Sequence, residues 1–206
     1  MSKRLKIAIQ KKGKLSDPSI NFLQSLGLEF NDNGRKLVNP CLNCDIDILY
    51  LRSGEIPEYV NRGIADFGIV GQNVLVEKGL EFRQSKPLKF SECELIIAIS
   101  QLSNIASAQG LEGKRIATSY PRTLKQYLDQ NSINAEIVTM SGSVEIAPIL
   151  DLADAVCDLT QTGNTLKAND LVVIDTILKS EAVLIASPFV EGENILKPYN
   201  LNFISL

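Results

Sequence analysis

Short apolar runs alternate along this chain with amphipathic segments, and this alternation limits the fold more than any single motif. The runs have strand length and are rich in Ile, Leu and Val, and most segments between them have helical length and spacing. We expect strands at residues 5–10, 37–38, 46–51, 65–70, 92–100, 115–118, 135–139, 155–159 and within 172–185, and helices at 18–26, 56–62, 72–78, 121–131 and 144–152. The pattern predicts an α/β fold with a parallel or mixed sheet covered on both faces. Residues 86–90 have the character of a crossover, so we infer two α/β lobes.

A polar turn follows the apolar strand expected at residues 155–159. The turn consists of Thr160, Gln161, Thr162, Gly163, Asn164 and Thr165. A helix is expected to open at Leu166. Where a strand passes through small residues into a helix, backbone N–H groups point outward without partners, and the threonine hydroxyls add donors. The turn is therefore a candidate anion site, although the same composition also occurs in ordinary turns.

Two carboxylates precede this turn. Asp154 and Asp158 are four residues apart, and carboxylates beside a phosphate site suit ribose hydroxyls or a magnesium ion carried by a sugar phosphate. The alternative is that Asp158 only caps or solvates a strand end. The sequence contains neither a Walker loop nor a G-x-G-x-x-G dinucleotide motif.

The composition excludes several classes of function. The net charge of −3 and the lack of a basic run with interleaved aromatics argue against a nucleic acid partner. The apolar runs are too short for a membrane span, and the first residues lead into a strand instead of a signal sequence, so we expect a cytoplasmic protein without a membrane partner. The chain has no histidine, which excludes Ser-His-Asp and Cys-His catalysis and any His-ligated metal.

The four cysteines form no recognisable metal site. Cys41 and Cys44 make a C-x-x-C motif, but no second pair or histidine completes a zinc site. We interpret these two as reduced thiols in a loop or at a strand edge, and Cys93 and Cys157 as small hydrophobic residues in strands. The chemistry must then come from carboxylates, cations, backbone donors and a metal ion brought by a substrate.

The string from Glu145 to Leu166 resembles the signature of the ATP phosphoribosyltransferase family. The matching residues are Glu145, Ala153, Val156, Asp158, Thr162, Gly163, Thr165 and Leu166. Residues 7–15, 47–57, 63–75 and 113–128 are similar to further blocks of the family, in the same order. Two positions depart. Asp151 stands where the family usually has glycine, and Asp tolerates left-handed dihedrals. Lys14 stands where it usually has arginine, which keeps the charge but loses the bidentate fork.

The resemblance implies a fold and a reaction. The fold would be that of the type II periplasmic binding proteins, with an interdomain cleft between lobe I (residues 1–89 and 176–206) and lobe II (90–175), which carries the phosphoribosyl-binding turn. The reaction would join C1 of phosphoribosyl pyrophosphate (PRPP) to N1 of the ATP adenine and release pyrophosphate, the first step of histidine biosynthesis. Mg²⁺ on the pyrophosphate would be the cofactor.

The resemblance also implies roles for individual residues. The turn at 160–165 would hold the 5-phosphate of PRPP, Asp154 and Asp158 would face the ribose hydroxyls, and Glu145 would contact ribose or Mg²⁺. The catalytic cations, which would neutralise pyrophosphate or ATP phosphates across the cleft, would be Lys11, Lys14 and Arg52. The residues shaping the ATP pocket would be Asp66, Gly68, Gly71 and Tyr120.

Structural explanations compete with several of these roles. Gly68 and Gly71 also fit turn or close-packing glycines, Asp66 also fits the end of a helix, and Tyr120 before Pro121 also fits a helix start. Two other classes of function also stay open: a non-catalytic two-lobed receptor for a small anion, and a phosphoribosyltransferase with a different base acceptor.

Family members also differ in length. The resemblance implies a short form that lacks a C-terminal allosteric domain, because the chain stops at Leu206. Such a form would be a homodimer that can assemble with a histidyl-tRNA-synthetase-like regulatory subunit, and histidine feedback would then need that subunit.

Overall fold

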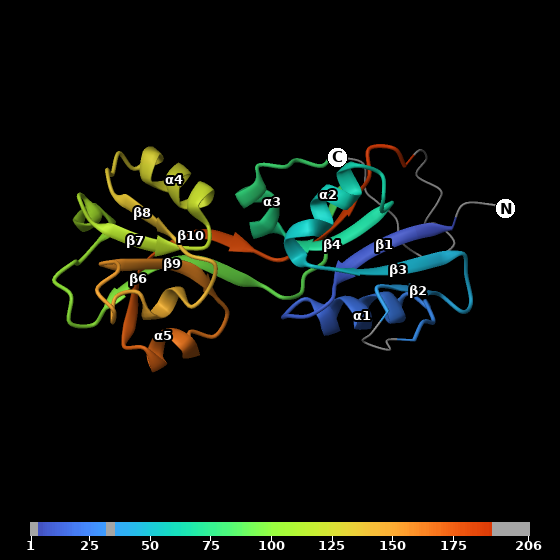
Figure 1. Ribbon diagram of the computed structural model, residues 1–206, viewed down its shortest axis with the longest axis horizontal. Coiled ribbons are helices and arrows are strands. Elements are labelled where there is room, and N and C mark those ends of the chain that lie inside the picture. The colour runs from blue at the N-terminus through green and yellow to red at the C-terminus, as the bar shows by residue number, and fades with distance from the viewer. Residues whose placement is uncertain (1–3, 32–35, 191–206) are drawn as a thin grey trace. The chain divides into compact units, whose positions relative to one another are not determined.

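The computed structural model describes residues 4–31 and 36–190 (Figure 1). The chain divides into two compact units. Unit 1 takes Met1–Leu75, Gly79–Ser91 and Glu181–Leu206, and unit 2 takes Val76–Lys78 and Glu92–Ser180. The chain returns to unit 1 at Glu181 instead of residue 176, because the last strand of unit 2 stays paired up to Ser180.

Unit 1 is built on a six-stranded mixed sheet with the order β2-β3-β1-β4-β11-β5. Its strands are β1 (Leu5–Gln10), β2 (Val38–Pro40), β3 (Ile46–Leu51), β4 (Phe67–Gly71), β5 (Ser85–Pro87) and β11 (Ala182–Ala186). β1 lies between β3 and β4 and is parallel to both, whereas β2, β11 and β5 join by antiparallel pairing. The carboxyl ends of β1, β3 and β4 therefore meet at one edge of the sheet, which we call the carboxyl edge of unit 1.

Both faces of this sheet are covered, because successive side chains of a strand point to opposite faces. Ile7 of β1 lies in the same buried cluster as Leu23 of α1 (Ser16–Ser25). The next residue, Ala8, lies in a different cluster with Ile56 of α2 (Ile56–Asn61). The other helices of this region are η1 (Ser53–Glu55) and α3 (Gln72–Lys78). The α/β layers predicted from the apolar periodicity are confirmed here.

Unit 2 contains a five-stranded mixed sheet with the order β10-β6-β9-β7-β8. Its strands are β6 (Cys93–Ser100), β7 (Arg115–Thr118), β8 (Glu136–Thr139), β9 (Ala155–Thr160) and β10 (Leu171–Ser180). β7 is parallel to β8 and β9, and β6 is antiparallel to β9 and β10. The carboxyl ends of β7, β8 and β9 thus share one edge, the carboxyl edge of unit 2.

Helices and turns also cover both faces of the second sheet. Ile97 of β6 shares a buried cluster with Leu124 of α4 (Pro121–Gln130). The neighbouring Ile96 shares another with Val144 of η3 (Val144–Ile146) and Leu166 of α5 (Asn164–Ala168). The short helix η2 (Ala108–Leu111) completes the unit. Within the described ranges, no helix is both long and apolar enough to cross a membrane.

The helix expected at residues 144–152 is wrong. The chain forms only η3 there and then a series of turns. Pro148 lacks the N–H that a helix interior requires, and its ring obstructs the preceding turn. Asp151 takes a left-handed conformation with φ 55°, which ends any helical course before β9.

Three smaller expectations also need correction. The helix expected at 18–26 begins at Ser16 instead, where the Ser16 N–H donates to Gly13 O at 3.0 Å and Ser16 Oγ donates to Lys11 O at 3.2 Å. α5 begins at Asn164 instead of Leu166. Part of the expected crossover at 86–90 pairs with β11 as β5, so the link into unit 2 is shorter than predicted.

Candidate active site

Three loops meet at the carboxyl edge of unit 2. Thr118 at the end of β7 is in register with Thr139 at the end of β8 and with Cys157 of β9, which continues to Thr160. The loops that follow these strands begin at Ser119, at residue 140 and at residue 161. Open α/β sheets bind ligands at the carboxyl ends of their parallel strands, so this edge is where a site is expected.

The turn after β9 passes through a left-handed glycine into a short helix. Gly163 adopts φ 72° and precedes α5, and its N–H donates to Thr160 Oγ1 at 3.1 Å. Thr162 and Thr165 are exposed, and the described part of the chain offers no acceptor for their backbone N–H groups. No heavy atom lies within 4 Å of a Cβ built on Gly163, so the space in front of the turn is open. The structure therefore presents hydroxyl and N–H donors to solvent at the predicted place.

Asp158 and Glu145 lie near this turn in the fold. Asp158 is a partly buried residue of β9, two positions before Thr160 on the same strand face, and its Oδ1 accepts from the Leu159 N–H at 2.8 Å. Glu145 belongs to η3, which follows the loop after β8, and it is partly buried. Val144 beside it shares a buried cluster with Leu166 of α5, so one core supports both segments.

Asp154 does not join the turn. It precedes β9 at the end opposite Thr160, and a six-residue strand spans about 17–20 Å. Its Oδ2 accepts from the Arg115 N–H at 2.8 Å and lies 3.5 Å from Arg115 Nε. The backbone N–H of Arg115 and its guanidinium hold the pKa of this carboxyl below its usual value. The predicted contact of Asp154 with ribose is not supported by this placement, because strand direction sends the residue to the other edge.

Tyr120 lies at the carboxyl edge of unit 2 as the N-cap of α4. Its N–H donates to Thr118 Oγ1 at 2.9 Å, and its carbonyl accepts from Leu124 N at 3.0 Å. The backbone of Tyr120 therefore has the structural role of a helix start, which was the alternative to an ATP contact. Its side chain is partly buried beside the α4 core.

The predicted cations meet at the carboxyl edge of unit 1. Lys11 follows β1 and its N–H donates to Leu51 O at 2.8 Å, which brings it beside Arg52 at the end of β3. Lys14 is exposed in the same turn, and so is Arg52 in the next loop. The described residues provide no carboxylate within ion-pair distance of Lys11, Lys14 or Arg52. Their positive charges are therefore not neutralised by a carboxylate of the described residues.

Two further polar residues of this edge were not among the predicted site residues. Gln10 ends β1, and its Oε1 accepts from the Leu15 N–H at 3.1 Å, so the side chain folds over the lysine turn. Asn73 is only 6% exposed at the start of α3, and a Cβ on Gly71 would meet its Oδ1 at 2.3 Å. A polar residue that ends an apolar strand is the sequence signal that identifies Gln10. The Asn73 side chain leaves no room for a Cβ at position 71, so packing explains the glycine there. Gly71 also ends β4 and so lies at the carboxyl edge of unit 1.

Asp66 and Gly68 have structural roles. Asp66 precedes β4, at the edge opposite the cations, and is 7% exposed. Its Oδ2 accepts from the Lys6 N–H at 2.8 Å. A Cβ on Gly68 would lie 2.6 Å from Ile56 Cγ2 and 2.8 Å from Val60 Cγ2, so glycine is needed for α2 to pack on β4. Neither residue is placed at the carboxyl edge as an ATP pocket would require.

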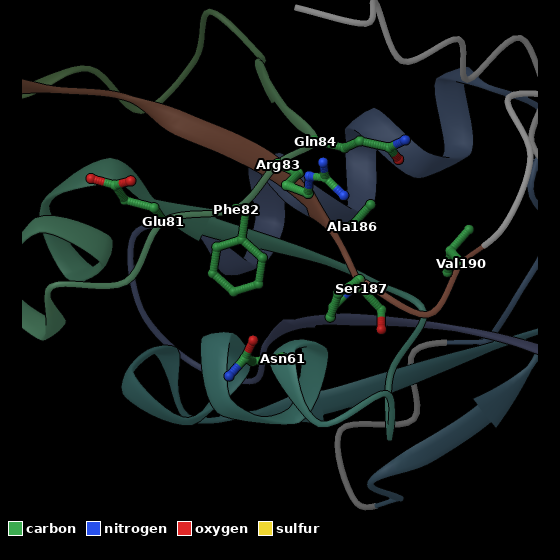
Figure 2. Close-up of a pocket in the computed structure, with 9 residues that line it drawn as sticks. Asn61, Glu81, Phe82, Arg83, Gln84, Ala186, Ser187 and Val190 are labelled. Carbon is green, nitrogen blue, oxygen red and sulfur yellow. The ribbon is translucent and has the colours of Figure 1, made fainter.

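A separate cavity of about 350 Å³ lies in unit 1 (Figure 2). It is lined by residues that include Asn61, Phe82, Arg83, Gln84 and Ser187. Ala186 in its wall pairs with Phe67 at the start of β4, so the cavity lies toward the amino end of that strand. None of the predicted site residues lines it.

Comparison with known proteins decides the family. Residues 52–197 match the family described as ATP phosphoribosyltransferase. A curated ATP phosphoribosyltransferase of Cytophaga hutchinsonii is 44% identical over 193 residues, which cover 94% of this chain and 68% of the relative. One of Parabacteroides distasonis is 41% identical over 191 residues, covering 93% of this chain and 68% of the relative. The chain belongs to the ATP phosphoribosyltransferase family.

Solved structures agree with this family assignment. The ATP phosphoribosyl transferase (HisG:HisZ) complex from Thermotoga maritima contains a chain with a TM-score of 0.76 and 30% identity, covering 89% of this chain and 88% of that one. The periplasmic VFT2 domain of Bordetella pertussis BvgS gives a TM-score of 0.57 at 16% identity, covering 88% and 80%, and shows the fold alone. The expected two-lobed fold like that of periplasmic binding proteins is confirmed.

Membership of the ATP phosphoribosyltransferase family also fixes the reaction. The activity is that of an ATP phosphoribosyltransferase, a pentosyl transfer to ATP that is consistent with the first step of histidine biosynthesis. The family match begins at Arg52 and includes the whole string from Glu145 to Leu166. The alternatives of a non-catalytic receptor and of another base acceptor are therefore set aside.

Proposed function

We propose that the turn formed by residues 160–165 binds the 5-phosphate of PRPP. The observation that carries this proposal is the left-handed Gly163, which has open space in front of it and exposed Thr162 and Thr165 on either side of it in the turn. Asn164 is exposed at the start of α5, and Thr160 braces the turn through its bond with the Gly163 N–H. A turn with several N–H and O–H donors suits the three terminal oxygens of a phosphate monoester.

The two carboxylates near this turn, Asp158 and Glu145, would bind the ribose of PRPP. Asp158 lies on the strand that leads into the turn, and Glu145 on a segment that shares its core. Both are partly buried, which suits carboxylates that accept hydrogen bonds from the 2- and 3-hydroxyls. Asp154 has no part in this proposal, because it is bonded to Arg115 at the opposite end of β9.

The cations at the carboxyl edge of unit 1 neutralise phosphate charge in the proposal. Lys11, Lys14 and Arg52 have no carboxylate partner among the described residues, so binding an anion breaks no ion pair. Pyrophosphate leaves with more localised negative charge than it has in PRPP, and cations aimed at that charge lower the barrier. Gly71 and Tyr120 lie at carboxyl edges and are retained as candidate contacts for ATP.

Mg²⁺ enters the proposal as part of the substrate. Among residues 4–31 and 36–190 no three His, Cys, Asp or Glu side chains are grouped to hold a metal ion. This donor set fits an ion that arrives on pyrophosphate oxygens and gains at most one or two protein ligands, with Glu145 as the candidate. Bound there, Mg²⁺ would offset the charge of the leaving group.

The chain's own residues contribute mainly alignment. Adenine N1 is a weak nucleophile, so the reaction depends on holding N1 and C1 at attack distance in two anionic substrates. The phosphate turn fixes one end of PRPP, and the carboxylates fix its ribose. Arg52 and the lysines stabilise the departing pyrophosphate.

The Thr162→Ala/Thr165→Ala double variant tests this assignment. Loss of charge-assisted hydrogen bonds of about 1.5–3 kcal/mol should raise KM for PRPP roughly 10- to 150-fold, while KM for ATP changes little. Thr176→Ala, an exposed threonine of β10, is the control and should leave both values unchanged. An unaltered KM for PRPP in the double variant would refute the phosphate assignment, and absence of phosphoribosyl-ATP formation by the native chain would refute the activity.

We also propose an assembly state and a cellular location for this chain. One similar solved structure is a HisG:HisZ complex, and we propose that this chain forms a homodimer that can bind a regulatory subunit of the histidyl-tRNA-synthetase type. We place the protein in the cytoplasm, where ATP and PRPP are available. Native mass spectrometry of the chain alone and mixed with such a subunit measures both assembly states, and a monomer that binds nothing would contradict this part.

A further inference from the structure

The loop between β2 and β3 contains two thiols that the transferase reaction does not use. Cys41 and Cys44 are both free cysteines, and only two residues separate them. Cys41 belongs to the buried cluster beneath α1, and Cys44 packs against the same cluster. The loop precedes β3, whereas Arg52 follows it, so the thiols and the cations lie at opposite ends of this strand.

Arg4 closes this loop from one side. Its Nη2 donates to the carbonyl of Cys41 at 3.3 Å, to that of Cys44 at 3.2 Å and to that of Ile46 at 2.8 Å. The Cys41 N–H also donates to Ile46 O at 2.8 Å. Two carbonyls bonded to a single nitrogen hold residues 41 and 44 close together, as the short Cα separation of a disulfide requires. The loop is thus already folded around the pair of thiols.

The residues between the cysteines fasten the loop to the end of α1. Leu42 N donates to Glu29 O at 2.7 Å, and Asn43 Nδ2 donates to Gly27 O at 2.7 Å. Asn43 Oδ1 in turn accepts from the Glu29 N–H at 3.1 Å. These bonds commit the Asn43 side chain to the Gly27–Glu29 segment, and Leu42 is exposed, so neither residue occupies the buried cluster that contains Cys41.

The two thiols differ in access. Cys41 is 6% exposed, whereas Cys44 is partly exposed. Burial, and next the adjacent Cys44 thiol, raise the pKa of Cys41 to about 12. The thiolate is the attacking species in thiol–disulfide exchange, so the accessible Cys44 reacts with an external reagent first and Cys41 second.

We propose that Cys41 and Cys44 form a site of reversible oxidative modification, at which a low-molecular-weight disulfide such as oxidised glutathione converts the two thiols into one intramolecular disulfide. The Cys44 thiolate attacks one sulfur of the reagent, forms a mixed disulfide and expels a thiolate. Cys41 then loses its proton and attacks the Cys44 sulfur, which forms the Cys41–Cys44 bond and expels the second thiolate. Two protein thiols are oxidised, one disulfide is reduced to two thiols, and the protons pass to the released thiolates.

Intact and peptide mass spectrometry of the full chain tests the proposal. The native protein is treated with oxidised glutathione, quenched with an alkylating agent and digested with trypsin, which places both cysteines in the peptide between Lys36 and Arg52. We expect this peptide to lose two hydrogen atoms and resist alkylation, and dithiothreitol to restore both thiols. Alkylation of both cysteines after the treatment, or a glutathione adduct on Cys44 that never resolves, would overturn the proposal.

Variants separate the two steps and do not touch the reaction site. Cys41→Ser should stop at a glutathione adduct on Cys44, and Cys44→Ser should leave Cys41 unmodified. Cys93→Ser is the matched control and should form the disulfide as the native chain does, because Cys93 lies in β6 of unit 2. An adduct on Cys41 in the Cys44→Ser variant would contradict the order of attack, and a disulfide between Cys93 and either thiol would refute the site. The readout is independent of transferase activity, so its failure leaves the proposed function untouched.

Discussion

The backbone N–H of Arg115 donates to Asp154 Oδ2 at 2.8 Å, and the Asp154 N–H donates back to Arg115 O at 2.8 Å. This reciprocal pair joins the starts of β7 and β9 at the edge of unit 2 opposite the phosphate turn. The Arg115 guanidinium also donates to Asp151 O at 2.8 Å and to Asp151 Oδ1 at 2.9 Å. The chain that carries Glu145 is therefore tied to the sheet immediately before it enters β9.

The pairing predicts an acid-dependent contribution of Asp154 to stability. Its folded-state pKa lies below the ordinary value because the Arg115 N–H and guanidinium favour the ionised form. The contribution is therefore full above the unfolded pKa of about 4 and is lost as pH falls through the folded value. Because the carboxylate is about one-third exposed (34%), we expect Asp154→Asn to cost only about 1 kcal/mol at pH 7 after allowance for solvent screening. Urea unfolding of the native chain and of Asp154→Asn, at pH 7 and at strongly acidic pH, measures this difference in the free energy of unfolding.

The pH dependence distinguishes this effect from a general packing loss. The difference between native chain and Asp154→Asn should shrink at acidic pH, since both side chains are then neutral. Asp129→Asn is the control, because Asp129 pairs with Lys125 on the exposed surface of α4, and it should cost little at either pH. A difference that stays constant over the pH range would show that the charge of Asp154 is not the cause.

Gly68→Ala should destabilise unit 1 without any ligand being involved. The added methyl would meet Ile56 Cγ2 at 2.6 Å and Val60 Cγ2 at 2.8 Å, both in the buried interior of α2. Overpacking of this kind costs about 1–3 kcal/mol, measured as the free energy of unfolding in urea. Gly142→Ala is the control, because a methyl group at that position would have no atom within 4 Å, and it should change stability by less than about 0.5 kcal/mol. Equal stability of the two variants would mean that α2 can move away from β4 freely.

The left-handed Asp151 predicts an order of stability among substitutions. At φ 55° a Cβ is strained by about 1 kcal/mol, and glycine is free of that strain but loses the exposed ion pair with Arg115. Asp151→Gly should therefore stay within about 1 kcal/mol of the native chain. Asp151→Ala keeps the strain and loses the pair, so it should melt at the lowest temperature of the three. Alanine that melts at or above glycine would refute this account of the position.

The sequence predicts the strands of both units well because their apolar runs are long and are bounded by polar turns. β1, β3 and β7 have the expected bounds, and Lys11 and Arg52 come together as parallel strand ends require. The helix at 144–152 fails because periodicity alone ignores Pro148 and the left-handed Asp151.

Asp154 and Asp66 show a different limit of the sequence interpretation. Each is close in sequence to a site residue but lies at the amino end of the strand that leads to it. Nearness along a strand is not nearness in space, since each residue adds about 3.3 Å. Asp66 and Asp154 each come before their strand in the sequence, whereas the candidate site residues come at or after a strand end. This order alone places the two carboxylates at the edge of the sheet opposite the site. The packing role of Gly68 was not available, because it depends on where α2 lies on the sheet.

Substitution of Arg52 tests the proposed role of the unit 1 cations in catalysis. Arg52→Ala removes a positive charge that has no ion-pair partner in the described ranges, so the folded chain should lose little stability. If the guanidinium stabilises the departing pyrophosphate, kcat/KM for PRPP should fall about 10²- to 10³-fold, the usual cost of losing a group that stabilises developing charge. Steady-state kinetics with PRPP and ATP varied in turn measures the effect.

Arg52→Lys separates the effect of the charge from that of the bidentate guanidinium, and Arg62→Ala is its control. Arg52→Lys keeps the charge and loses the bidentate fork, so it should recover part of the lost kcat and leave KM raised. Arg62→Ala is the matched control, because Arg62 pairs with Glu58 on the exposed end of α2 away from the carboxyl edge, and it should keep native kinetics. If Arg52→Ala and Arg62→Ala behave alike, the carboxyl edge of unit 1 does not bind pyrophosphate, and the cations there must be assigned to another anion.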